Sequence, residues 1–281
     1  MKLARYRGAL SALLILIPAV ISATGNSAVP QTSFDSKSLV WYASYGSNLD
    51  CERFMCYIKG GTPRGALRSN PGCRDSSDPL ESRRILIKGF ELYFADDERA
   101  QRSWGGAPAF IRRNASSSVN GRMYLITYQQ FNDVVLQEND FRKREELADR
   151  LPVSPNSIDK KRGFSLKEIK PDALYDQVLY VGDEGGHAIF TFTTTHTELP
   201  SGAPSGPYLQ VILKGLKDTY ADKTETSIYE YVSSAGGIQG LMTPEKLKRL
   251  TLQRAPALAA KTPGEEGGGC KCPSSASVRA P

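Results

Sequence analysis

The chain has 281 residues, of which 40% are hydrophobic and 23% are charged, and its formal net charge is +6. This is the balance of an ordinary globular protein with enough chain to bury a core. Three of the positive charges, Lys2, Arg5 and Arg7, lie at the extreme N-terminus. The charge on the remaining chain is too weak to indicate nucleic acid as the main partner.

The first 23 residues have the layout of a secretory signal peptide. Basic residues precede an apolar run over residues 9–22, and Ile21-Ser22-Ala23 offers a small-residue cleavage site. The run is short for a bilayer span of about 20 residues, and Pro18 interrupts it. We expect a signal peptide over residues 1–23 and a location in the secretory pathway or periplasm. The alternatives are an uncleaved membrane anchor and a misplaced start codon, the latter with a cytoplasmic location.

The globular domain is predicted to span residues 39–255. Residues 24–38 are polar and turn-rich, which is typical of a linker. Residues 256–281 consist mainly of Ala, Pro, Gly and Ser, and we expect a disordered tail there.

The domain opens with a predicted buried strand, Leu39–Tyr45, which Gly46-Ser47-Asn48 ends. Asn48 is a good N-cap for a helix that begins near Leu49, and Gly60-Gly61 would stop that helix. Further strands are expected at residues 84–94, 110–111 and 121–126.

The second half of the domain alternates between helices and strands. The clearest helix is predicted over Tyr128–Leu151, where Thr127 and Gln130 have the spacing of a capping box. A hairpin is expected from residues 178–181 and 188–193 through a glycine-rich turn. Two more helices are predicted, over residues 207–217 and from Pro244, each with proline in its first turn.

The turn at Gly46-Ser47-Asn48 is a candidate anion site. A strand that feeds a helix through small residues leaves backbone amides exposed at the helix N-terminus, where the helix dipole adds partial positive charge. Ser47 and Asn48 would add side-chain donors. This pattern suits a carboxylate or a developing oxyanion. The alternative is an ordinary strand–helix connection.

Glu138 is the candidate acid/base. Phe131, Val134, Val135 and Glu138 are spaced so that the carboxylate lies on the apolar face of the predicted helix. A desolvated carboxylate in a pocket suits proton transfer near neutral pH. The alternative is a carboxylate on the helix flank that pairs with Arg142 at i+4.

Taken together, these segments resemble the γ-glutamylcyclotransferase-like family. Residues 45–49 match its Tyr-Gly-Ser-Asn-Leu signature, and Leu136-Gln137-Glu138 is similar to the segment that carries its catalytic glutamate. Weaker matches are Trp104-Gly105-Gly106 and the Tyr208 segment. The resemblance covers about residues 39–215, with its segments in the same order.

The resemblance implies an α+β fold, a mixed and partly closed β-barrel with flanking helices. It also implies a cyclotransferase that acts on a small-molecule γ-glutamyl substrate and needs no metal or cofactor. The substrate's α-amine attacks its own γ-carbonyl, which releases 5-oxoproline and a free amine. By position, Glu138 would be the acid/base, and the substrate would be bound by Tyr45, Gly46, Ser47, Asn48, Leu49 and Tyr208.

The resemblance leaves the leaving amine open. Glutathione, γ-glutamyl amino acids, γ-glutamyl-ε-lysine and a γ-glutamyl-protected metabolite all fit the reaction. It also leaves open a second kind of function, a non-catalytic module on the same fold that binds a small molecule or a protein. Such a module would keep the Gly-Ser-Asn turn but would need no buried glutamate.

Two segments depart from the small animal enzymes of the family. Residues 56–75, which include Pro71-Gly72-Cys73-Arg74-Asp75, resemble a largely bacterial subgroup, and residues 147–175 are expected to cover the pocket and to alter the substrate. Some relatives of this kind carry a histone deacetylase label. A zinc deacetylase needs His and Asp ligands, and the chain has only His187 and His196.

The five cysteines form no even framework of disulfides. Cys51, Cys56 and Cys73 lie near the predicted site, and Cys270 and Cys272 lie in the tail. An odd count argues against a disulfide scaffold. If the chain is exported, Cys73 could pair with Cys51 or Cys56.

Overall fold

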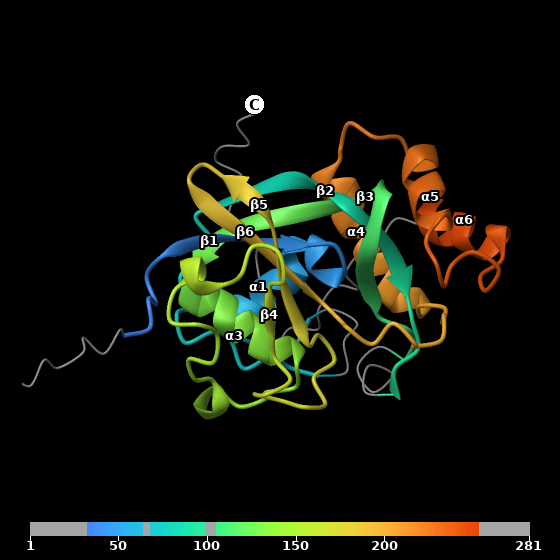
Figure 1. Ribbon diagram of the computed structural model, residues 1–281. Helices are drawn as coiled ribbons and strands as arrows, with labels where there is room; N and C mark the ends of the chain where they lie inside the picture. Colours follow the sequence, from blue (N-terminus) through green and yellow to red (C-terminus); the bar gives the residue numbers. More distant parts are fainter. Residues whose placement is uncertain (1–32, 64–67, 99–104, 253–281) are drawn as a thin grey trace, which may run out of the picture. The chain divides into compact units, whose positions relative to one another are not determined.

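The computed structural model describes residues 33–63, 68–98 and 105–252 (Figure 1). The predicted signal peptide, Trp104 and the C-terminal tail lie outside these ranges, as does most of the predicted linker. Within the described residues, no helix combines the length and the apolar character needed to cross a membrane.

A six-stranded mixed sheet forms the centre of the domain, in the order β2-β3-β1-β6-β5-β4. The strands are β1 (Leu39–Ser44), β2 (Glu81–Phe94), β3 (Ala109–Thr127), β4 (Phe164–Ser165), β5 (Gln177–Glu184) and β6 (His187–Thr193). The β1–β6 pair is parallel and the other pairs are antiparallel. Since β2 and β4 end the sheet, it is only partly closed. The expected α+β class, a mixed and partly closed sheet with flanking helices, is confirmed.

The helices pack on both faces of this sheet (Figure 1). They are η1 (Ser47–Leu49), α1 (Cys51–Lys59), α3 (Tyr128–Glu138), η2 (Arg144–Glu146), η3 (Pro155–Ser157), α4 (Gly206–Thr219), α5 (Glu225–Ser233) and α6 (Pro244–Leu252). Trp41 and Ala43 of β1 share one core with α4, α5 and α6, whereas Val40 and Tyr42 share the other with α1 and α3. The period of two along a strand thus divides β1 between two cores.

Several local predictions are confirmed. Thr127 and Gln130 form a complete capping box at the start of α3. Gly60, with φ +83°, ends α1 in a conformation that favours glycine. The β5–β6 hairpin, α4 and α6 also form close to the predicted positions.

The predicted helix over Tyr128–Leu151 is wrong in its second half, because α3 ends at Glu138. The Asn139 side chain donates to the carbonyl of Val135 and accepts from the backbone amide of Tyr175, and Asp140 has a left-handed φ of +74°. The chain therefore turns away from the helix axis. The two short strands predicted at residues 110–111 and 121–126 are parts of one long strand, β3, and α5 was not predicted.

The two segments that depart from the family pattern both pack against α3. Arg74 pairs with Asp133, and Gln130 donates to the carbonyls of Asp75 and Ser77. The second segment also contacts this helix, because Asn132 accepts from the backbone amides of Arg150 and Leu151. Arg74 of the first segment pairs with Asp149 of the second as well. Both segments are therefore anchored to α3 and to each other.

Cys73 in the first of these segments is a free, fully buried thiol. It lies within hydrogen-bonding distance of the Gln130 carbonyl and the Gln137 side chain. The expectation that Cys73 pairs with Cys51 or Cys56 is therefore wrong. Cys51 and Cys56 are themselves disulfide-bonded, so neither is available to Cys73.

Candidate active site

A cavity of about 170 Å³ lies where β1 meets η1 and where α3 ends. Its walls come from β1, η1, α1, α3, β6, α4 and the two extra segments. The residues that line it are Tyr42, Ser44, Tyr45, Gly46, Ser47, Asn48, Arg53, Tyr57, Arg68, Asn70, Pro108, Ala109, Gln137, Glu138, Asn139, Asp140, Arg142, Lys170, Asp172, Leu174, Tyr175, Phe192 and Tyr208. Six of the seven site residues predicted from the sequence are among them.

The turn after β1 differs from the predicted one. A single 3-10 turn separates the strand from α1, closed by bonds from the amides of Leu49 and Asp50 to the carbonyls of Gly46 and Ser47. Asp50, not Asn48, caps α1, because its side chain accepts from the amide of Arg53 at 3.1 Å. The sequence predicts that the dipole of a helix starting at Leu49 would favour an anion at this turn. That part of the prediction is wrong, because α1 begins at Cys51 and Asp50 caps it.

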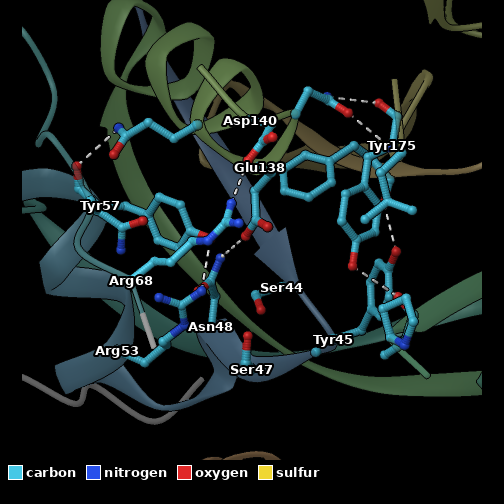
Figure 2. Close-up of a pocket in the computed structure, with 18 of the residues that line it drawn as sticks. Ser44, Tyr45, Ser47, Asn48, Arg53, Tyr57, Arg68, Glu138, Asp140 and Tyr175 are labelled. Carbon is cyan, nitrogen blue, oxygen red and sulfur yellow. Dashed lines mark hydrogen bonds and ion pairs between the residues drawn. The ribbon is translucent and has the colours of Figure 1, made fainter. Parts of the chain in front are cut away.

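Asn48 is free for another role because it does not cap the helix. The side-chain nitrogen Nδ2 of Asn48 donates to Glu138 Oε1 at 2.8 Å (Figure 2). The same nitrogen lies 3.1 Å from the Tyr42 hydroxyl. The side chain is buried, and its Oδ1 has no hydrogen-bond partner within the described chain. A buried polar atom without a partner is expensive, so Oδ1 indicates a place where a ligand donor fits.

Glu138 is the last residue of α3 and its carboxylate faces the cavity (Figure 2). It is half-buried, which leaves room for a substrate to reach it. The alternative ion pair with Arg142 does not form, because the Arg142 Nε binds Asp140 at 2.6 Å instead. Residues 48 and 138 thus meet across the cavity although 90 positions separate them in the sequence.

Buried tyrosines make up much of the remaining wall. Burial raises the pKa of the Tyr208 phenol to about 12, and the nearby Glu138 carboxylate contributes to the increase. Burial likewise raises the pKa values of Tyr42, Tyr45 and Tyr175 well above the ordinary range, again with a contribution from Glu138. These phenols stay neutral at physiological pH, so they act as hydrogen-bonding groups rather than as charges.

Two of these tyrosines are held by the backbone. The Tyr45 hydroxyl donates to the carbonyl of Phe192 at 2.7 Å, and the Tyr208 hydroxyl accepts from the amide of Ala109 at 3.1 Å. Gly46 completes this wall, since a Cβ there would lie 3.5 Å from the Tyr208 hydroxyl. Tyr208 thus lines the cavity, as the resemblance implied.

Leu49 is the predicted site residue that does not line the cavity. Its side chain is fully buried in the core shared with α4. A Cβ added to Gly215 of α4 would lie 2.5 Å from the Leu49 Cβ, so the helix packs directly on the turn. Leu49 therefore fixes the turn from behind, while Tyr45, Gly46, Ser47 and Asn48 face the cavity.

Sequence reasoning missed the polar residues that α1 and the two extra segments bring to the cavity. They are Arg53, Tyr57, Arg68, Asn70, Lys170, Asp172 and Tyr175. The i, i+4 spacing of Arg53 and Tyr57 on one helix face was a usable signal, and the Arg53 guanidinium does donate to the Tyr57 hydroxyl at 2.9 Å. The others are placed by long-range contacts that the local sequence does not encode.

Metal ligands do not gather in the part of the chain that the structure describes. No group of three or more His, Cys, Asp or Glu side chains there could hold a metal ion. His196 instead lies 3.7 Å from the buried Asp176, and neither His187 nor His196 lines the cavity.

Comparison with known proteins gives two kinds of likeness. No family model matches the chain. Histone deacetylase 5 of Arabidopsis thaliana is 31% identical over 190 residues, which is 63% of this chain and 28% of that protein. The chain therefore spans little more than a quarter of the length of this curated relative.

Solved structures supply the second kind of likeness. A gamma-glutamyl cyclotransferase matches with a TM-score of 0.42 and 16% identity, over 76% of this chain and 98% of its own. An uncharacterized protein from Homo sapiens matches with the same TM-score and identity, over 76% of this chain and 99% of its own.

Proposed function

We propose that the protein is a cyclotransferase that acts on γ-glutamyl amines or γ-glutamyl amino acids and releases 5-oxoproline and a free amine. The observation that carries this proposal is the 2.8 Å hydrogen bond from Asn48 to Glu138. It joins the Tyr-Gly-Ser-Asn turn to the predicted acid/base inside one cavity. Two sequence features that each have an ordinary structural explanation thus come together in space.

The reaction needs little from the protein beyond folding the substrate and moving protons. Glu138 accepts a proton from the substrate's α-ammonium group, and the amine nitrogen then attacks the γ-carbonyl carbon. A C–N bond forms and the carbonyl oxygen becomes an oxyanion. When the oxyanion collapses, the original amide C–N bond breaks and Glu138 gives its proton to the leaving nitrogen. The ring nitrogen then passes its extra proton to the freed Glu138 carboxylate, from which the released amine takes it up, so Glu138 ends deprotonated.

The turn supplies the groups for binding and for the oxyanion. Its closing bonds use the amides of Leu49 and Asp50, whereas the amides of Ser47 and Asn48 have no backbone acceptor in the described chain. Preorganised N–H donors of this kind stabilise charge that develops in a transition state. Asn48 also fixes the orientation of the Glu138 carboxylate through its side chain.

The test is release of 5-oxoproline by the purified full chain from a panel of γ-glutamyl compounds. Glu138→Gln keeps the acceptor for Asn48 but removes the acid/base, so we expect kcat/KM to fall by about 10²–10⁴-fold. Glu198→Gln, at an exposed carboxylate outside the cavity, is the matched control. A folded wild type that is silent on the whole panel, or a Glu138→Gln variant as active as wild type, would contradict the proposal.

The second candidate function is a binding module without catalysis. The unpartnered buried atoms Asn48 Oδ1 and Asn70 Nδ2 favour it, because they need a ligand but no chemistry. Calorimetric binding of a γ-glutamyl compound by a wild type that releases no 5-oxoproline would support it.

A further inference from the structure

Two arginines lie at the cavity beside Glu138, and one acidic residue binds both. Arg68 Nη1 lies 3.5 Å from Asp140 Oδ1, and Arg142 Nε lies 2.6 Å from the same oxygen. All three residues line the cavity. Figure 2 shows the Arg68 guanidinium reaching toward the space in front of Glu138. We call Arg68, Arg142 and Asp140 the arginine pair and its anchor.

The arginine pair carries more positive charge than its anchor neutralises. Two guanidinium groups share one carboxylate, which leaves one positive charge in excess. Each guanidinium has five N–H donors. In the described chain the only hydrogen bond from these two groups is the one from Arg142 Nε to Asp140. Most of their donors therefore remain open to a ligand.

The exposure of these groups suits exchange with a ligand. The side chains of Arg68, Arg142 and Asp140 are 42%, 32% and 56% exposed. Ion pairs this exposed contribute little to stability, so an incoming anion can compete for the guanidinium groups at low cost. A carboxylate matches the planar fork of a guanidinium with two parallel hydrogen bonds.

Two independent observations mark the same place as functional. Asn70, two residues after Arg68, is 5% exposed and lines the cavity, and its Nδ2 has no hydrogen-bond partner in the described chain. Asp140 is the only residue other than glycine with positive φ among those described. Backbone strain of this kind concentrates at binding and catalytic sites.

We propose that the arginine pair is a carboxylate subsite for the part of the substrate that leaves, so that the enzyme prefers γ-glutamyl amino acids or peptides to γ-glutamyl amines. This inference rests on the proposed cyclotransferase function and narrows its substrate class. In this assignment the Ser47 and Asn48 amides bind the glutamyl end, and the arginine pair, which lines the same cavity, binds the leaving part. Asn70 Nδ2 supplies a further donor at this end.

The test compares two substrates that differ only in the second carboxylate, γ-glutamyl-alanine and γ-glutamyl-alaninamide. Wild type should prefer the carboxylate in kcat/KM. In the double variant Arg68→Gln/Arg142→Gln this preference should fall by about tenfold or more, the usual effect of losing hydrogen bonds to a charged group. Arg162→Gln is the matched control, since Arg162 is 87% exposed and does not line the cavity.

The outcomes separate this inference from the proposed function. An unchanged preference in the double variant overturns the subsite, even if activity on both substrates falls together. If wild type releases no 5-oxoproline from either compound, the proposed function fails, and calorimetry of both ligands on wild type and double variant decides the subsite. A binding preference for the carboxylate that the double variant loses supports it, whereas no binding or no preference overturns it.

Discussion

Arg74 contacts two carboxylates that differ in burial, so the two contacts should contribute differently to the free energy of unfolding. Its Nη2 lies 2.8 Å from Asp133 Oδ1 and 2.7 Å from Asp149 Oδ1. The Asp133 side chain is fully buried, whereas that of Asp149 is 38% exposed. Because breaking a buried pair leaves an uncompensated charge, the two contacts should differ greatly in energy although their distances are nearly equal.

Arg74→Met should lower the free energy of unfolding by about 3 kcal/mol, the lower end of the range for a broken buried pair. The lower end applies because the Arg74 side chain is 24% exposed, and because Asp133 keeps its bonds from the Arg74 amide and the Asn132 side chain. For a domain of this size the expected fall in Tm is about 6–12 °C. Asp149→Asn, the control, should cost about 0–1 kcal/mol.

Asp133→Asn should fall between these two variants. It removes the buried charge, and the Arg74 guanidinium keeps Asp149 and contact with water. Urea unfolding of the three single variants, followed by circular dichroism, would measure the order directly. A cost for Asp149→Asn as large as that for Arg74→Met would refute the reasoning, as would a cost below about 1 kcal/mol for Arg74→Met.

Three further predictions concern two residues that line the cavity, Asp140 and Tyr208, and one that packs behind the turn, Gly215. Asp140 has a φ of +74°, a conformation that valine tolerates poorly and glycine well. In urea unfolding, Asp140→Val should therefore lower the free energy of unfolding by about 1–2 kcal/mol and Asp140→Gly by less than about 1 kcal/mol. Equal losses in the two variants would argue against backbone strain at this position. Gly215→Ala should lower both stability and turnover, because the added Cβ would lie 2.4 Å from the Asp50 amide nitrogen. Alanine alone would stabilise a helix by about 1 kcal/mol relative to glycine, so a variant more stable than wild type would contradict this prediction. Burial raises the pKa of Tyr208 from 10.0 to about 12, so its contribution to stability is complete below pH 10 and is lost as pH rises to about 12, about 2–3 kcal/mol in all. Tyr208→Phe should therefore lose less stability than wild type between pH 9 and 12, and an identical loss would show that other groups cause it.

The local elements of the fold could be predicted from the sequence where neighbouring residues determine them. The capping box at Thr127 and the stop at Gly60 depend on contacts within a few positions. The end of α3 could not be predicted in this way. It depends on bonds between Asn139 and Tyr175, which are 36 positions apart, and the periodicity of residues 128–151 carries no trace of them.

The candidate site shows the same division. The turn at residues 45–48 and Glu138 could be found from motif and spacing, but the role of Asn48 could not. By sequence rules Asn48 is a good helix cap. In the structure a 3-10 turn follows β1, so that Asp50 caps α1 and the Asn48 side chain binds Glu138 instead. Arg68 and Asn70 were missed because a long-range ion pair at Arg74 fixes their segment.

Three successive residues at the end of α3 organise the whole site. Glu138 accepts from Asn48 of the turn, Asn139 exchanges bonds with the backbone of Tyr175, and Asp140 binds Arg68 and Arg142. Because Glu138 is the last residue of a rigid helix, its carboxylate is held against the turn with little freedom. The two extra segments contact the same helix end, through Arg68 and Tyr175. If the proposed function holds, these segments determine which leaving group fits, while the contact between residues 48 and 138 stays the same. On the proposed function, therefore, chains that keep the turn and the glutamate but lack these segments should share the chemistry and differ in the amine that they release.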